Sequence, residues 1–220
     1  MLTPASKRIC IWAVPRSGST FLYTGLWKHL INNYNNFNTL FNNLHKGSEP
    51  FRDSKEDSPR ILQAFKREPC WLAKLHNRDL RYLKAHSMDK VFYDMCDYNI
   101  VLTRKDLFEA TLSLCIAKQK MQFINAQQDS IPIVIDKQFF EREYKGTIDN
   151  TNCIIDYVKA DTVLYTEELP SDPNSIWHMF TGTEPIKSID NPIKMSPDKQ
   201  SVVTNYDELK ELYNALRTSR

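Results

Sequence analysis

The region spanning residues 9–31 constrains the fold more than any other part of the chain. An apolar run at 9–14 is followed by the Gly/Ser/Thr-rich heptapeptide 15–21 (PRSGSTF) and by a helix-like stretch at 22–31. A strand that turns through such a loop into a helix forms an anion cradle, because the first helical amides lack internal partners and the helix dipole favours negative charge. The heptapeptide therefore predicts a phosphate or sulfate site.

The polar residues of the heptapeptide suit that role. Gly18 lets the backbone approach an anion closely, and Arg16 is a planar cation with several donors. Hydroxyl donors come from Ser17, Ser19 and Thr20. The loop differs from the nucleoside triphosphatase motif GxxxxGK[ST], which has a lysine immediately before the last hydroxyl residue.

The heptapeptide resembles the 5'-phosphosulfate loop of the sulfotransferases, written PKSGTTW or PRSG[ST]T in that family. Those enzymes bind 3'-phosphoadenosine-5'-phosphosulfate (PAPS), move its sulfuryl group to an acceptor hydroxyl or amine, and release 3',5'-bisphosphoadenosine (PAP). The resemblance implies that residues 16–21 bind the phosphosulfate and that Arg16 acts on the leaving phosphate. Phe21 stands where cytosolic members have a tryptophan that stacks on adenine, so it either stacks there or packs in the core.

A second motif follows far along the chain. Residues 99–103 form a short, β-branched strand candidate, and Arg104 comes directly after it. Asp106 is placed to cap the next helix, with Glu109 completing an Asp version of the capping box. Ser113 lies two turns into that helix. A strand-end arginine and a helix serine can clamp one phosphate from two sides.

Residues 102–114 resemble the 3'-phosphate element of the sulfotransferases, in the version of one bacterial branch. They depart from the cytosolic version, R-N-x-x-D-x-x-x-S, in the spacing from arginine to aspartate. The resemblance implies that Arg104 and Ser113 hold the 3'-phosphate of PAPS. Taken alone, the two residues have another explanation, in which Arg104 pairs with Glu109 or Asp106 and Ser113 bonds to the backbone of its own helix. Residues 164–169 (LYTEEL) weakly echo the Y-E-D-L of the family.

Transfer to an acceptor hydroxyl needs a general base within hydrogen-bond reach, and the family uses a histidine or a glutamate. Glu49 is the first candidate, because its surroundings partly match the family segment G-x-P-x-E-[YF]-F, although a proline follows the glutamate. His76, at the end of a strand candidate at 71–76, is the second, and His45 is the third. Lys74 in the same strand is either a phosphosulfate ligand or a solvated lysine.

Strand and helix candidates alternate along the chain. The strand candidates are 9–14, 71–76, 99–103 and 161–165, and the helix candidates are 22–31, 61–67, 77–85, a helix from 106, 139–158, 177–180 and 206–216. This alternation predicts an α/β fold whose central parallel sheet is flanked by helices, with ligands at the carboxyl ends of the strands. The resemblance implies the P-loop-like sulfotransferase fold. A length of 220 residues suits a single domain over 1–220.

Composition argues against several other classes of protein. The net charge of +2 gives no support for a nucleic-acid or membrane-surface partner. No apolar run approaches the roughly 18 residues of a transmembrane helix, and no signal-peptide stretch stands at the start. The five cysteines are scattered without a CxxC pair, so we expect reduced thiols, a cytoplasmic setting and no metal site.

Two other functions stay open. A phosphotransferase of the wider P-loop class is disfavoured by the missing lysine and by the lack of a clear magnesium carboxylate. A non-catalytic PAP- or nucleotide-binding module would keep the cradle without a base. The sulfuryl acceptor is also open among a carbohydrate, a tyrosine-bearing peptide and a small phenol or alcohol, and its pocket is expected from 32–60 and 122–138.

Overall fold

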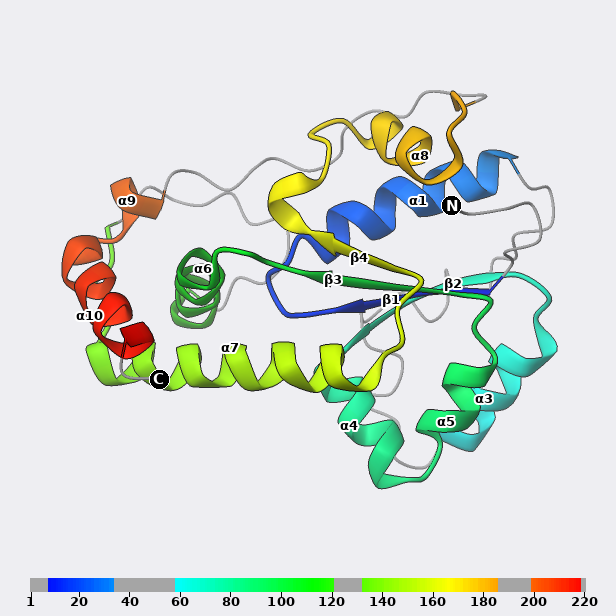
Figure 1. The fold of residues 1–220 in the computed structure, drawn as a ribbon, viewed down its shortest axis with the longest axis horizontal. Coiled ribbons are helices and arrows are strands. Elements are labelled where there is room, and N and C mark those ends of the chain that lie inside the picture. Colours follow the sequence, from blue (N-terminus) through cyan, green and yellow to red (C-terminus); the bar gives the residue numbers. More distant parts are fainter. Residues whose placement is uncertain (1–7, 34–57, 121–131, 186–198, 219–220) are drawn as a thin grey trace.

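A computed structural model describes residues 8–33, 58–120, 132–185 and 199–218 (Figure 1). Within them the chain forms a four-stranded, all-parallel sheet in the order β2-β1-β3-β4, with helices on both faces. The predicted α/β class with a central parallel sheet is therefore confirmed. Of the helices in these residues, none is long and apolar enough to span a bilayer.

The strands lie within a residue of their predicted positions. They are β1 (Arg8–Ala13), β2 (Trp71–His76), β3 (Tyr98–Thr103) and β4 (Thr162–Tyr165). The two central strands, β1 and β3, are covered on both faces, which explains why their sequences are almost continuously apolar. The register sets Ala13 beside both His76 and Leu102, so β2, β1 and β3 end at the same edge of the sheet.

Helices connect these strands and cover the sheet. They are α1 (Ser19–Asn33), α3 (Ser58–Arg67), α4 (Asn77–Ala85), α5 (Asp89–Asp94), α6 (Leu107–Gln119), α7 (Lys137–Tyr157), η1 (Thr166–Glu168), α8 (Pro173–Thr181), α9 (Lys199–Val202) and α10 (Tyr206–Thr218). The helix predicted from 106 begins at Leu107 and has Asp106 as its N-cap, as expected. The sequence did not predict α5, because six residues with Phe92 as their buried member show no helical period.

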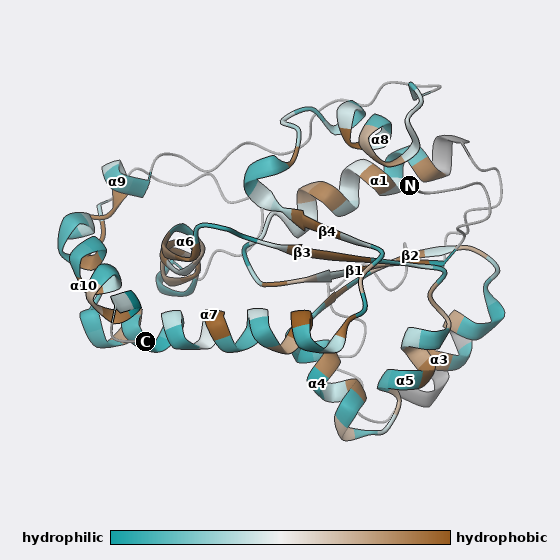
Figure 2. Ribbon diagram, viewed as in Figure 1, coloured by the Kyte–Doolittle hydropathy of each residue, from teal (hydrophilic) through white to brown (hydrophobic). Residues whose placement is uncertain are grey.

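Side chains along β1 alternate between two hydrophobic cores. Ile9 and Ile11 pack with α1 and α8 on one face of the sheet. Cys10 and Trp12 pack on the other face, in a core that α3, α4, α5 and the end of α7 complete. Figure 2 shows hydrophobic residues along much of the strands, and both hydrophobic and hydrophilic residues along the helices on either side. This burial fixes the strand ends on which the candidate site is built.

A third cluster anchors α6 beside the sheet. Phe108 near the start of α6 packs against Phe140 of α7, with ring centroids 5.7 Å apart, and against Tyr213 of α10 at 5.4 Å. Because Phe108 is fully buried, the first turn of α6 is held against two other helices. The predicted anchor residues Arg104 and Ser113, which flank this turn, are thereby carried on a fixed element.

A substitution at Phe92 can test how α5 packs on the sheet. Its ring lies 5.9 Å from that of Trp12, at 90°, and 5.2 Å from that of Phe65. Phe92→Ala should lower the free energy of unfolding in urea by about 3–5 kcal/mol, since it removes a buried ring and leaves a cavity. The neighbouring Val91 is 38% exposed, so Val91→Ala should change stability by less than about 0.5 kcal/mol. Equal stability of the two variants would contradict this packing.

Candidate functional site

The predicted anion loop joins β1 to α1 at the carboxyl edge of the sheet. The amide of Val14 donates to the carbonyl of Leu102 at 3.1 Å, and the amide of Ser17 donates to the carbonyl of Val14 at 3.2 Å. The amide of Leu22 donates to the carbonyl of Gly18 at 3.1 Å, so the amides of residues 19–21 precede the helical hydrogen-bond ladder. Together with the helix dipole, these amides favour an anion at the mouth of the loop.

Two residues of the loop have left-handed backbone conformations. Gly18 has φ 72°, and a Cβ there would lie 3.3 Å from the Cγ2 atom of Thr166. Glycine thus meets both a conformational and a steric need at this position. Arg16 has φ 65°, which costs a non-glycine residue about 1–2 kcal/mol. Such strain is common at ligand-binding sites, where the surrounding structure imposes it.

A side-chain hydrogen bond of Arg16 connects the predicted anion loop to α6, on which the predicted site residue Ser113 lies. Its Nε atom donates to the Oγ atom of Ser113 at 3.0 Å, across 97 residues of sequence. Ser113 is 7% exposed on α6. Burial, followed by repulsion from the charge of Arg104, lowers the pKa of Arg16 from its usual value. Positive charge at this edge of the sheet favours an anionic ligand.

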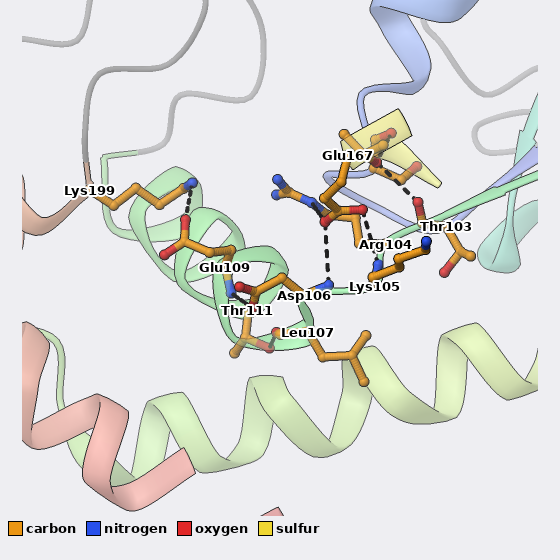
Figure 3. Close-up of polar contacts among 11 residues, drawn as sticks. Thr103, Arg104, Lys105, Asp106, Leu107, Glu109, Thr111, Glu167 and Lys199 are labelled. Carbon is orange, nitrogen blue, oxygen red and sulfur yellow. Dashed lines mark hydrogen bonds and ion pairs between the residues drawn. The ribbon is translucent and has the colours of Figure 1, made fainter. Parts of the chain in front are cut away.

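Arg104 follows β3 and is held by a residue that the sequence did not suggest. Its Nε atom donates to the Oε1 atom of Glu167 at 3.3 Å (Figure 3). Among the described residues, Arg104 thus pairs with Glu167 rather than with Asp106 or Glu109. Asp106 instead accepts the amide of Glu109 at 2.9 Å as the helix cap, and the Glu109 carboxylate binds the Lys199 ammonium at 2.5 Å. Of the two hydrogen bonds of the expected capping box, the structure therefore has the one from the Glu109 amide to Asp106.

Lys74 approaches the loop from β2. The side chain is buried, although the sequence left open that it was solvated. Its Nζ atom donates to the Oγ1 atom of Thr20 at 3.3 Å, in the first turn of α1, and lies 5.9 Å from the ring centroid of Tyr23. The positive charge of this lysine, beside the positive end of α1, adds to the anion preference of the loop.

His76 is the last residue of β2, two positions after Lys74. Its Nδ1 atom is 2.9 Å from the carbonyl oxygen of Ala13, the last residue of β1. A carbonyl only accepts, so this contact requires a proton on Nδ1. The backbone amide of His76 donates to Asp79 at 2.9 Å, which holds the residue at the start of α4. His76 is thus an oriented imidazole beside the anion loop.

Ser17 is fully buried in the loop. Its Oγ atom has no hydrogen-bond partner in the described part of the chain, and the same is true of the Oγ1 atom of Thr103 at the end of β3. Unsatisfied buried hydroxyls are unfavourable, by about 1–3 kcal/mol each.

The other predicted site residues fall into two groups. Ser19 is buried, Thr20 is exposed, and Phe21 is half-buried against the core shared by β1, α1 and α8. Glu49 and His45 lie outside the described residues, as does most of the expected acceptor pocket. A role for Glu49 as base stays a prediction.

Sequence reasoning missed the contribution of the segment that follows β4. The Oγ1 atom of Thr166 lies 2.6 Å from the carbonyl oxygen of Ser17 and 3.0 Å from that of Thr103. Glu167, next in the chain, binds Arg104. The one signal that pointed to this segment was the echo of the Y-E-D-L sequence at 164–169.

Neither a metal centre nor a relative defines the site further. Across the described ranges, no group of three or more His, Cys, Asp or Glu side chains is placed to hold a metal ion. Comparison with known protein families, curated proteins and solved structures finds no match for this chain. What the site does therefore has to be inferred from its residues.

Two glycines give a matched test of the loop geometry. Gly18→Ala should lower the free energy of unfolding by about 1–2 kcal/mol, because alanine is strained at positive φ and its Cβ would crowd Thr166. Gly146 lies within α7, where an added Cβ meets nothing within 4 Å, so Gly146→Ala should raise stability by about 0.5–1 kcal/mol. Chemical denaturation measures both, and an unchanged or raised stability in Gly18→Ala would contradict the loop conformation.

Proposed function

We propose that this chain is a sulfotransferase, which moves the sulfuryl group of PAPS to an acceptor hydroxyl or amine and releases PAP. The observation that carries the proposal is the 3.0 Å hydrogen bond from Arg16 to Ser113. It joins the residue expected at the 5'-phosphosulfate to a residue expected at the 3'-phosphate. A nucleotide with phosphates at both positions needs two adjacent anion sites, whereas a chance match to a loop motif gives no reason for the second.

The residues of the loop fit the 5'-phosphosulfate. The amides of residues 19–21 are donors suited to its oxygens. Arg16 and Lys74 add positive charge from two directions, one from the loop and one from β2. Residues 14–21 include no acidic side chain that would oppose that charge.

Arg104 and Ser113 fit the 3'-phosphate. Among the described residues, Arg104 makes its hydrogen bond through Nε alone, so the four N–H donors on its terminal nitrogens are suited to a phosphate. Ser113 contributes a hydroxyl from the adjacent face of α6. This pair distinguishes the proposal from an ATP-dependent phosphotransferase, which has no use for a 3'-phosphate site.

The chemistry asked of the site is in-line group transfer. PAPS supplies a sulfuryl group whose sulfur is bonded to the oxygen that bridges it to the 5'-phosphate. As the acceptor oxygen bonds to that sulfur, the bond from sulfur to the bridging oxygen breaks, and its electron pair stays on the 5'-phosphate of PAP. Arg16 and Lys74 would stabilise the negative charge that develops there.

His76 is the base that we favour. The acceptor loses its proton as it attacks, and the Nε2 atom of the neutral imidazole is suited to take it. The 2.9 Å contact between Nδ1 and the carbonyl of Ala13, at the end of β1 where the loop begins, favours the tautomer with its proton on Nδ1. Glu49 remains the alternative base.

Calorimetric titration with PAP, ATP and 5'-AMP at fixed salt tests the proposal. PAP should bind with a micromolar or lower Kd, and ATP and 5'-AMP at least about tenfold more weakly, because they lack the 3'-phosphate. Preference for ATP would favour a phosphotransferase instead. Tight PAP binding without sulfuryl transfer from PAPS to any of the three acceptor classes would favour a non-catalytic module, and no binding of PAP would overturn the proposal.

Arg104→Ala should separate the two phosphates. It should weaken PAP binding by about tenfold or more, as expected for loss of a charged hydrogen-bond donor, and change 5'-AMP binding by less than about twofold. Arg142→Ala is the matched control. The Arg142 side chain is 72% exposed on α7 and lies far along the chain from Arg104 and Ser113. Equal losses for PAP and 5'-AMP in Arg104→Ala would contradict the assignment of the 3'-phosphate.

The two candidate bases can be compared directly. His76→Gln should lower kcat by about 10²-fold or more without changing PAP affinity, because the amide cannot take the acceptor's proton. Glu49→Gln should leave kcat within about threefold of the wild-type value. The reverse pattern, measured as transfer of labelled sulfuryl from PAPS, would make Glu49 the base.

A further inference from the structure

The segment that follows β4 contacts both anion sites. The hydroxyl of Thr166 lies 2.6 Å from the carbonyl oxygen of Ser17, in the loop, and 3.0 Å from that of Thr103, at the end of β3. A hydroxyl has one proton, which these two carbonyls share. We call Thr166 and Glu167 the clasp, because together they bind the loop and the start of α6.

Glu167 binds the α6 side of the site through three donors. Its carboxylate accepts the Nε–H of Arg104 at 3.3 Å and the amides of Lys105 and Asp106 at 3.1 and 3.3 Å (Figure 3). Partial burial opposes its ionisation, but the hydrogen bonds from these amides and the charge of Arg104 lower its pKa overall. The group is therefore a carboxylate at neutral pH and only accepts.

This arrangement has two consequences for Arg104. The backbone amides just before α6, which would otherwise attract an anion, are already bound by the protein's own carboxylate. The guanidinium is planar, so a hydrogen bond at Nε fixes the direction in which its terminal nitrogens point. An arginine held in this way loses less freedom when it binds a phosphate than a mobile one does.

We infer that Glu167 is a positioning residue, which aims the terminal nitrogens of Arg104 at the 3'-phosphate while Thr166 keeps that anchor in register with the phosphosulfate loop. The inference rests on the proposed function, because it specifies how this chain would select a 3'-phosphorylated nucleotide. Glu167 itself would touch no ligand atom and would act through Arg104.

The chain offers a matched control for Glu167. The next residue, Glu168, forms an ion pair with the Lys105 side chain, and the two side chains are 51% and 55% exposed. Exposed pairs of this kind contribute little to stability. Glu168→Gln removes the same charge one residue away without removing a hydrogen bond to Arg104.

The test is the ratio of PAP affinity to 5'-AMP affinity, measured by calorimetry. Glu167→Gln should lower this ratio by about fivefold or more, because the amide cannot accept all three donors, whereas Glu168→Gln should leave it unchanged. In an Arg104→Ala background, Glu167→Gln should cause no further fall if it acts through the arginine. An unchanged ratio in Glu167→Gln, a raised ratio, or a further fall in that background would overturn the inference.

A ligand-free measurement keeps the inference separate from the proposed function. In nitrogen-15 NMR spectra of arginine side chains, the Nε–H of Arg104, assigned with Arg104→Lys, should exchange at least about tenfold more slowly in the wild type than in Glu167→Gln. Equal exchange rates would overturn the inference even if PAP binds well. Slow exchange in a wild-type protein that does not prefer PAP to 5'-AMP would overturn the proposed function and, with it, the role in selecting a 3'-phosphate. If Glu167→Gln does not fold, Glu167→Asp, which shortens the carboxylate by one methylene, should show both effects in weaker form.

Discussion

The parallel pairing of β1 with β3 is the constraint on which the candidate site depends. Ala13 lies beside Leu102, and the amide of Val14 continues the pairing beyond β1 by donating to the carbonyl of Leu102 at 3.1 Å. The two strands therefore end at one level, and the loop with Arg16 and the segment with Arg104 leave the sheet side by side. Both strands are buried from two sides, so the cores beneath them hold these ends in place.

Several features of the site oppose stability in the absence of a ligand. Arg16 adopts a left-handed backbone conformation, and the buried Ser17 hydroxyl has no partner among the described residues. Each is unfavourable by about 1 kcal/mol or more. The positive charges of Arg16 and Lys74 also lie at this edge of the sheet. A ligand with phosphates at two positions would offset these charges, which supports the proposed bisphosphorylated nucleotide.

The sequence predicted what local patterns encode and missed what tertiary contacts decide. Apolar runs located all four described strands, and the capping residue Asp106 located the start of α6. The partner of Arg104 was not predictable in this way, because Glu167 lies 63 residues away on a segment with no period. For the same reason the expected capping box did not form completely. The amide of Asp106 donates to Glu167, and the Glu109 carboxylate binds Lys199.

The central claim is that the loop at residues 15–21 and the Arg104–Ser113 pair form two adjacent anion sites for one nucleotide. A crystal structure of the protein grown with PAP tests it most directly. The account predicts the 5'-phosphate on the amides of residues 19–21, and the 3'-phosphate within hydrogen-bond distance of the terminal nitrogens of Arg104 and the hydroxyl of Ser113. A 3'-phosphate exposed to solvent, or PAP bound away from the carboxyl edge of the sheet, would contradict it.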